Sequence, residues 1–140
     1  MTKPLVSIIT PCYNGEAFLK RYFESILNQT YPNLELIFIN DGSTDRTEEI
    51  ALSYRERLEK RGITYIYEKQ ENAGQAAALN RGLKLFTGEY LTWPDSDDEM
   101  VSDAVEKKVD YLEQHPDYGF CICKTKVVNE NNPEMKCGYY

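Results

Sequence analysis

The sequence predicts an α/β domain of three layers, in which helices cover both faces of a mostly parallel sheet. Short apolar segments alternate along the chain with segments of helical periodicity, in the order β-α-β-α-β-α-β. The apolar segments are almost uninterrupted, as in residues 34–40 (LELIFIN), which is typical of parallel strands buried on both faces. Polar residues follow these segments, so a ligand site is expected where the strands end.

Turn residues bound each expected strand. The strands are residues 5–10, 34–40, 63–67, 90–93 and 120–128, and the fourth is expected to be buried. Helical spacing of apolar side chains predicts helices between them, over residues 18–27, 45–58, 75–86 and 101–114. At the start of the second helix, Asp45 with Glu48 three residues later resembles a capping box.

Length and charge narrow the class of protein. The chain of 140 residues is long enough for a single domain with one core. Its net charge is −7 and it has no run of Lys or Arg, which argues against nucleic acid as the main partner. No segment approaches the length of a bilayer span and no signal-peptide core starts the chain, so we expect a cytoplasmic protein.

The four cysteines, Cys12, Cys121, Cys123 and Cys137, are expected to be free thiols. No CxxC pair occurs, and Cys121 and Cys123 are two apart in an expected strand, which is a poor geometry for a disulfide. This usage fits a reducing compartment. The single histidine, His115, precedes a proline and is expected to serve the end of a helix rather than a metal site.

Asp95, Asp97 and Asp98 place three carboxylates within four residues, directly after an expected strand. Their mutual repulsion favours a cation, and Mg²⁺ typically takes one or two protein carboxylates and leaves its other positions to water and phosphates. The cluster therefore predicts a site where a divalent metal meets a phosphorylated substrate. An acidic turn that caps the next helix is the alternative, because Asp is a favoured N-cap residue.

The acidic cluster belongs to one of three polar loops that the fold brings to one crevice. The other two are residues 10–14 (TPCYN) and residues 40–45 (NDGSTD). In a sheet of order 3-2-1-4 the first and fourth strands are neighbours, and all three loops line the same edge. The sequence has neither a Gly-x-Gly-x-x-Gly fingerprint nor a P-loop, which excludes the dinucleotide-binding and P-loop interpretations.

These loops and two further segments resemble family 2 glycosyltransferases, which have the GT-A fold. The matching segments are residues 6–14 (VSIITPCYN), 40–45 (NDGSTD), 72–74 (NAG), 78–82 (ALNRG), 88–91 (GEYL) and 95–98 (DSDD). They occur in the family's order and spacing from Pro4 to about Lys126. Leu79 departs from the family, many of whose members carry arginine before the asparagine, and this weakens the case for a cationic contact to a diphosphate there.

The resemblance implies a nucleotide-sugar site and assigns its residues. Tyr13 is placed like the residue that stacks on the nucleobase, a contact of roughly 1–3 kcal/mol, and Asp41 like the aspartate that accepts a hydrogen bond from the base. Asp95 corresponds to a ribose contact, and Asp97 with Asp95 to the ligands of a divalent metal, Mg²⁺ or Mn²⁺, that bridges the diphosphate. The implied nucleotide-binding residues are Pro11, Tyr13, Asn14, Asp41, Asn72, Gly74, Asn80, Asp95 and Ser96.

Several of these residues also have a structural interpretation. Tyr13 could be a half-buried loop aromatic, and Asp41, which begins an Asp-Gly pair, could serve a turn. Asn80 could hold its helix in place, and Asp98 could cap the helix that follows it. Gly74 is expected to allow the backbone to approach the base closely.

The implied activity is transfer of a sugar from a nucleotide diphosphate sugar to an acceptor hydroxyl, with inversion at the anomeric carbon. The resemblance points to cell-surface polysaccharide or glycoconjugate synthesis with a saccharide or lipid-linked acceptor, and a lipid-linked one would bring the protein to the inner face of the membrane. The acceptor proton needs a general base, and the spare carboxylates Asp117 and Glu130 match no motif. We therefore expect the base beyond residue 140, and a chain that is incomplete at its C-terminus and inactive alone.

Other classes stay open. One is a module, or an inactive fragment, that binds a nucleotide sugar without catalysis. Another is a phosphate-receiving flavodoxin-like domain with Lys124 near the last strand, although its acidic pair would be expected after the first strand, where residues 11–13 (PCY) stand. A homo-oligomer is also open, because missing C-terminal elements would expose an apolar edge.

Overall fold

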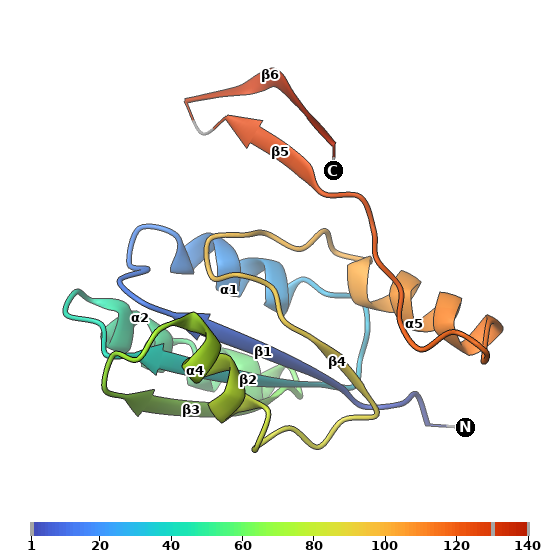
Figure 1. Cartoon of the computed structure of the whole chain (residues 1–140), viewed down its shortest axis with the longest axis horizontal. Helices are drawn as coiled ribbons and strands as arrows, with labels where there is room; N and C mark the ends of the chain where they lie inside the picture. Colours follow the sequence, from blue (N-terminus) through green and yellow to red (C-terminus); the bar gives the residue numbers. More distant parts are fainter. Residues whose placement is uncertain (1, 130, 140) are drawn as a thin grey trace. The chain divides into compact units, whose positions relative to one another are not determined.

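The computed structural model describes residues 2–129 and 131–139, with side-chain surroundings for residues 2–128 and 131. It contains two compact units, Met1–Glu106 and Lys107–Tyr140. The strands are β1 (Val6–Cys12), β2 (Leu34–Asp41), β3 (Thr64–Gln70), β4 (Tyr90–Thr92), β5 (Lys126–Asn129) and β6 (Asn132–Tyr139). The helices are α1 (Leu19–Leu27), α2 (Thr47–Ser53), α3 (Arg55–Lys60), α4 (Gln75–Gly82) and α5 (Ala104–Gln114), as labelled in Figure 1 except for α3.

Four parallel strands of the first unit form one sheet in the order β3-β2-β1-β4, which confirms the predicted order. β1 pairs with β2 from Val6↔Leu34 onward and with β4 from Val6↔Tyr90 onward. Every residue of β1 and β2 is buried, because helices cover the sheet on both faces. Since the strands are parallel, their carboxyl ends meet at one edge of the sheet (Figure 1).

One face of the sheet packs against α1 and the α2–α3 region through aromatic rings. The ring centroid of Phe23 in α1 lies 5.4 Å from that of Phe38 in β2 and 4.6 Å from that of Tyr54, on which it stacks. Tyr22 is fully buried beside Phe23, and its hydroxyl bonds to that of Thr10 in β1. Each such pair of rings stabilises the layer by about 0.5–1.5 kcal/mol beyond the apolar area that it buries.

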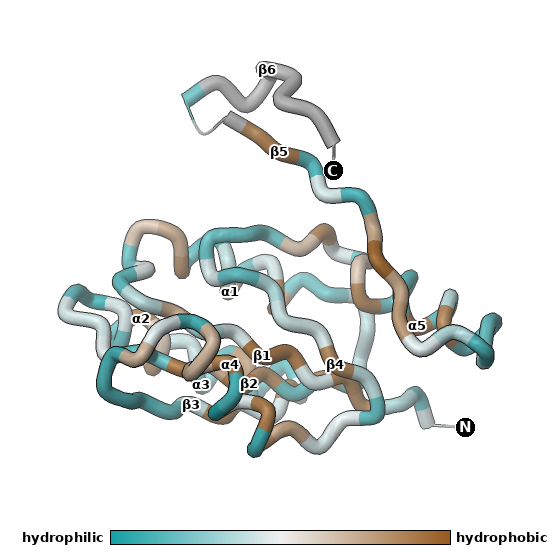
Figure 2. The backbone as a smooth tube through the Cα atoms, viewed as in Figure 1, coloured by the Kyte–Doolittle hydropathy of each residue, from teal (hydrophilic) through white to brown (hydrophobic). Residues whose placement is uncertain are grey.

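The opposite face packs against α4. Ile9, Ile37 and Ile39 form a fully buried cluster with Ala78 of α4. Gly82, the last residue of α4, lies so close to β1 that a Cβ on it would be 2.3 Å from Ile9 Cγ2. Figure 2 shows the hydrophobic residues of β1 and β2 between largely hydrophilic loops. The three predicted layers are therefore present.

A buried carboxylate fastens the amino-terminal end of this sheet. Glu35 of β2 is 2% exposed and accepts hydrogen bonds from the Ser7 hydroxyl at 2.5 Å and from the Thr87 amide at 2.6 Å. The Thr87 hydroxyl adds a bond at 3.0 Å, and the Gly88 amide donates to Ser7 Oγ at 2.9 Å. These donors compensate the burial of the charge and hold the α4–β4 connection against β1 and β2.

The helix expected over residues 45–58 is broken in two. α2 ends before Tyr54 and α3 begins after it, and this break lets the Tyr54 ring stack on Phe23. The expected capping box is wrong, because Glu48 pairs with Lys69 of β3 instead of turning back to the start of the helix.

The helix expected over residues 75–86 is shorter than predicted. α4 ends at Gly82, and the amides of Leu85 and Phe86 both donate to the Gly82 carbonyl in the tight turn that follows. The close contact of Gly82 with β1 fixes where the chain turns away. The apolar periodicity continued into this turn because Leu85 packs on the same core as α4.

The fourth and last predicted strands are too long, and the fourth is not buried. β4 covers only Tyr90–Thr92, which are half-buried, and Trp93 is 59% exposed. The reason is that β4 is the edge strand of the sheet. The strand expected over residues 120–128 begins only at Lys126, and Phe120 and Ile122 are exposed. β5 pairs with β6 in an antiparallel ribbon, and a ribbon of two strands buries little apolar surface by itself.

Three stacked rings lie at the carboxyl end of α5 in the second unit. Tyr111 and His115 lie 4.2 Å apart between ring centroids, and His115 and Tyr118 lie 5.3 Å apart. His115 Nδ1 is 2.7 Å from the Tyr111 carbonyl oxygen, which agrees with the helix-terminus role predicted for this histidine.

The cysteines agree with the sequence as far as the structure describes them. Cys12, Cys121 and Cys123 are free thiols. The side chain of Cys137 and the residue Glu130 lie outside the described part of the chain. Within that part, no helix combines the length and the apolar character needed to cross a bilayer.

We expect Gly82→Ala to lower the free energy of unfolding by about 1–3 kcal/mol, because the added methyl group overpacks the contact with Ile9. Urea denaturation of the purified chain measures this change. Gly119→Ala is the matched control, since a Cβ there meets no atom within 4 Å. Equal midpoints for the two variants would contradict the tight docking of α4 on β1.

Candidate functional site

A pocket of about 340 Å³ opens in the first unit at the carboxyl edge of the sheet. The loops after β1 and β4, the end of β2 and the start of α4 form its wall. The lining residues are Pro11, Cys12, Tyr13, Asn14, Gly15, Phe18, Asp41, Gln75, Asp95, Ser96 and Asp97. The structure thus brings together the three polar loops that the sequence placed at one crevice.

A second pocket of about 470 Å³ lies in the first unit between α1 and residues 99–102. Two ion pairs involve charged side chains of its wall, Arg21 with Glu99 and Glu24 with Arg57. The lining of this pocket includes none of the residues that the sequence singled out. The smaller pocket is therefore the candidate site.

Asp41, at the end of β2, is 3% exposed and fully engaged with the backbone around it. Its Oδ1 accepts bonds from the Ala73 amide at 2.9 Å and Gln70 Nε2 at 2.7 Å, and its Oδ2 accepts one from the Gly74 amide at 2.9 Å. Burial raises the pKa of this carboxyl, but the three hydrogen bonds outweigh it and leave the pKa below its ordinary value. Asp41 therefore stays ionised and fixes residues 73–74 at the pocket.

Two glycines border the segment that Asp41 holds, and a Cβ on Gly74 would meet no atom within 4 Å. Gly74 has a φ of +89°, and Gly42 a φ of +73°, both in the region that favours glycine. A Cβ on Gly42 would lie 2.6 Å from the Asn72 amide nitrogen, so these two segments touch. Asn72 and Gly74 are thus beside Asp41 without lining the pocket, whereas Asn80 is exposed farther along α4.

The acidic loop after β4 borders the pocket with two carboxylates. Asp95 Oδ1 accepts a hydrogen bond from Gln75 Nε2 at 2.7 Å, and the Asp98 amide donates to the Asp95 carbonyl at 3.2 Å. Burial, followed by the charges of Asp97 and Asp95, raises the pKa of the Asp98 carboxyl. The prediction that Asp98 caps the next helix is wrong, because α5 begins only at Ala104.

Asp95 and Asp97 fit a hard divalent cation. Both line the pocket, and after burial their charges are the causes that raise the pKa of the neighbouring Asp98. Among the residues that the structure describes, no group of three or more His, Cys, Asp or Glu side chains could hold a metal ion. Two carboxylates at an open pocket suit an ion whose other positions are filled by water and phosphate oxygens.

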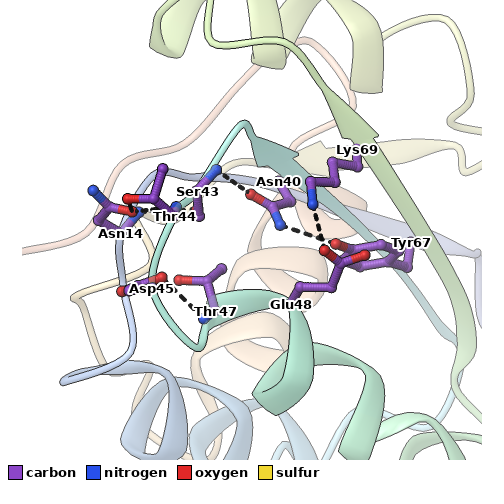
Figure 3. Close-up of polar contacts among 9 residues, drawn as sticks. All are labelled: Asn14, Asn40, Ser43, Thr44, Asp45, Thr47, Glu48, Tyr67 and Lys69. Carbon is purple, nitrogen blue, oxygen red and sulfur yellow. Dashed lines mark hydrogen bonds and ion pairs between the residues drawn. The ribbon is translucent and has the colours of Figure 1, made fainter.

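Tyr13 stands at the mouth of the pocket with 54% of its surface exposed. The next residue, Asn14, has a φ of +51°, which is uncommon for a residue other than glycine. Asn14 lines the pocket, but its Oδ1 accepts the Thr44 amide at 2.9 Å and its own amide donates to Ser43 Oγ at 3.0 Å (Figure 3). The bend after Tyr13 is therefore held by the loop that follows β2.

Sequence reasoning missed Cys12, Gly15, Phe18 and Gln75 in the lining. Cys12 is buried, which raises the pKa of its thiol, although hydrogen bonding with Ser96 and Thr47 partly opposes the rise. A Cβ on Gly15 would lie 2.5 Å from Cys12 Sγ, so the chain bends tightly over the thiol. Two of them had a signal, because Cys12 lies within the matching residues 6–14 (VSIITPCYN) and Gln75 follows the matching residues 72–74 (NAG) at the start of a helix.

A family model for glycosyl transferase family 2 matches residues 7–137. The chain belongs to glycosyl transferase family 2. Glycosyltransferase RP339 of Rickettsia prowazekii, described as uncharacterized, is 37% identical over 135 residues, which are 96% of this chain and 40% of that protein. TuaG of Bacillus subtilis, whose name assigns it provisionally to teichuronic acid biosynthesis, is 37% identical over 79% of this chain and 42% of its own length. The chain thus spans less than half of these two family members.

Two solved structures of glycosyltransferases share the fold and confirm it as GT-A. A 1–349 fragment of TarS from S. aureus, in complex with UDP-GlcNAc, gives a TM-score of 0.73 at 26% identity over 80% of this chain and 32% of that one. The mannosyltransferase PcManGT of Pyrobaculum calidifontis, in complex with GDP-Man and Mn²⁺, gives 0.71 at 29% identity over 80% and 33%.

We expect the stability of the chain to fall as the pH drops below the ordinary aspartate pKa of 3.8. Folding lowers the pKa of Asp41, so its contribution is present above that value and is lost as the folded carboxyl takes up its proton. Urea denaturation at pH 6 and at about pH 3 measures the loss, which should be smaller in Asp41→Asn.

Asp98 provides a control of opposite sign. Folding raises its pKa, so the folded state binds this proton more tightly and gains stability as the pH falls. Asp98→Asn should therefore make the acid loss steeper than in the unmodified chain. Identical pH slopes for the two variants would show that neither carboxyl is perturbed by the fold.

Proposed function

We propose that this chain forms the donor-binding site of an inverting family 2 glycosyltransferase that takes a nucleoside diphosphate sugar. The observation that carries the proposal is the pocket itself, which joins an exposed tyrosine, a buried ionised aspartate and a pair of carboxylates. The similar proteins TarS and PcManGT, bound to UDP-GlcNAc and GDP-Man respectively, support this class of ligand.

The nucleobase end of the donor lies between Tyr13 and Asp41 in this proposal. The exposed face of the Tyr13 ring offers a stacking surface for a base, worth about 1–3 kcal/mol. Asp41 Oδ2 accepts only the Gly74 amide among the hydrogen bonds described, which leaves a lone pair for an N–H of the base. Residues 72–74 would follow the edge of the base, since Asp41 fixes two of their amides.

The diphosphate end lies against the acidic loop. Asp95 and Asp97 would hold Mg²⁺ or Mn²⁺, as the Mn²⁺ complex of PcManGT supports, and Asp95 would exchange its bond with Gln75 for the ribose or the metal. The ion would neutralise the charge that develops on the leaving diphosphate. Ser96 lies between the two carboxylates in the sequence and lines the same wall. Its hydroxyl would donate a hydrogen bond to the nucleotide sugar.

Transfer itself needs an acceptor hydroxyl and a group that takes its proton. In this proposal the carboxylates that line the pocket, Asp41, Asp95 and Asp97, all serve the donor. We propose that the general base and the acceptor site belong to the part of the family's length that this chain does not span. The name of TuaG, which refers to teichuronic acid biosynthesis, supports a polymer of the cell envelope as the product. We propose the cytoplasmic side of the membrane as the place of transfer.

We expect UDP or GDP with Mn²⁺ to raise the melting temperature of the chain by about 5–10 °C at a hundredfold excess over Kd, because the ligand binds only the folded state. Thermal denaturation with and without Mn²⁺ measures the shift. Asp97→Asn should remove the part of the shift that depends on Mn²⁺. Asp110→Asn, in α5 and outside the pocket lining, should keep it. A shift of equal size in both variants would refute the assigned metal ligand.

We expect the purified 140-residue chain to bind the donor without transferring the sugar. The proton acceptor for the incoming hydroxyl is then absent, so only slow hydrolysis of the donor would be seen. Chromatography of labelled UDP-sugar and GDP-sugar with candidate saccharide acceptors measures transfer. Mn²⁺-dependent formation of a glycosylated acceptor would overturn this part of the proposal.

A further inference from the structure

We infer that Asp45 is a positioning residue of the donor site, which holds Tyr13 in place without touching the ligand. This inference rests on the proposed function. Asp45 is absent from the lining of the pocket, whereas Tyr13 is part of it. The connection between them is a set of hydrogen bonds that join residues 14–16, after β1, to residues 43–47, after β2. We call this set the loop interlock.

The first half of the loop interlock is a reciprocal exchange at Asn14. The Asn14 amide donates to Ser43 Oγ at 3.0 Å, and Asn14 Oδ1 accepts the Thr44 amide at 2.9 Å. Each loop thus both gives and receives a bond, which fixes their relative position in two directions (Figure 3). Asn14 is held in its left-handed conformation by these bonds, and such a conformation persists only where the surroundings determine it.

The second half is centred on Asp45. Its Oδ2 accepts the Glu16 amide at 3.0 Å, and the Arg46 amide returns a bond to Glu16 Oε2 at 2.9 Å. Its Oδ1 accepts the amide of Thr47, the first residue of α2, at 2.9 Å. One carboxylate therefore ties the loop after β1 to the start of a helix. Burial raises the pKa of Asp45, but hydrogen bonds from the Thr47 hydroxyl and from the amides of Glu16 and Thr47 outweigh it and lower the pKa below its ordinary value, so the charge persists at neutral pH.

Thr47 adds a further hydrogen bond to the loop interlock. It is fully buried, and its Oγ1 accepts the Gly15 amide at 2.9 Å. Three successive amides after Tyr13, those of residues 14, 15 and 16, therefore all donate to side chains of the loop after β2 or of α2. The course of the backbone after Tyr13 is set by that loop rather than by contacts of the Tyr13 ring, which is half exposed.

The loop after β2 is itself fastened to the sheet. Asn40 is fully buried at the end of β2, its Oδ1 accepts the Ser43 amide at 2.9 Å, and its Nδ2 donates to the Tyr67 hydroxyl of β3 at 2.9 Å (Figure 3). The loop interlock therefore connects the segment after Tyr13 to the sheet through the loop that follows β2, and this connection restricts the motion of that segment. A base that stacks on Tyr13 meets a ring whose backbone is already fixed, which reduces the entropy lost on binding.

Hydrogen exchange tests the loop interlock without any ligand. In Asp45→Asn, whose side-chain amide cannot accept both bonds, the amides of residues 15–16 should exchange at least about tenfold faster. The amides of α1 and β2 should keep their rates. Thr47→Val, which removes the acceptor for Gly15, should give the same local effect. Unchanged exchange at residues 15–16 in both variants would overturn the inference.

Binding tests the role of Asp45 for Tyr13. Against UDP with Mn²⁺, Tyr13→Ala should lose about tenfold in affinity and Asp45→Asn about fivefold. The double variant should lose no more than Tyr13→Ala alone, because Asp45 acts through the ring. Inorganic pyrophosphate with Mn²⁺, which has no base to stack, should bind all three variants as it binds the unmodified chain. Glu49→Gln, which breaks the exposed pair with Arg46 in α2, is the matched control and should change neither ligand.

The outcomes separate the inference from the function on which it rests. If the unmodified chain binds neither UDP nor GDP, the proposed function fails, and hydrogen exchange still decides whether the loop interlock exists. If UDP binds but Asp45→Asn weakens UDP and pyrophosphate alike, or its loss adds fully to that of Tyr13→Ala, Asp45 has only a structural role. Isothermal titration calorimetry at fixed salt provides all of these affinities.

Discussion

Parallel pairing of β1 with strands on both sides is the constraint on which the pocket depends. β2 and β4 both start level with Val6, so the segments that follow all three strands emerge at one edge. β4 stops after three residues while β1 continues to Cys12. The acidic loop therefore runs beside the last residues of β1, where the Thr10 hydroxyl donates to the Pro94 carbonyl at 3.3 Å. The loop that carries Asp95 and Asp97 thus shares the pocket with the loop that carries Tyr13.

Aspartates perform two different tasks around this pocket. The carboxylates of Asp41 and Asp45 accept hydrogen bonds from backbone amides. These bonds contribute to the lowered pKa of each carboxyl. They order the loops that present other groups. The acidic loop behaves in the opposite way, because burial, followed by repulsion from Asp97 and Asp95, raises the pKa of Asp98. The fold thus satisfies the carboxylates that hold it together and concentrates negative charge where a cation and a diphosphate could meet.

The strand order and the three-loop pocket could be predicted from the sequence because apolar strands and polar loops leave a strong pattern in one dimension. The features that could not be predicted depend on contacts between distant segments. The break at Tyr54 follows from the stacking of its ring on Phe23. Glu48 does not form the expected capping box, because its side chain pairs with Lys69. Likewise, Asp45 was assigned only a helix cap, since its bond to the Glu16 amide appears only when two loops meet. The roles assigned to the site residues remain predictions, both for those that line the pocket and for Asn72, Gly74 and Asn80, which do not.

The buried Glu35 has a consequence for the order in which the chain folds. Its bonds to Thr87 join residues 52 apart in the sequence, and the bond from Gly88 to Ser7 joins residues 81 apart. Contacts of this span close the largest loops of the sheet and carry the greatest entropic cost. We expect the first three strands to assemble before β4 is added, and the acidic loop to reach its final position last. The end of the pocket that carries Asp95 and Asp97 would then form after the end that carries Tyr13 and Asp41.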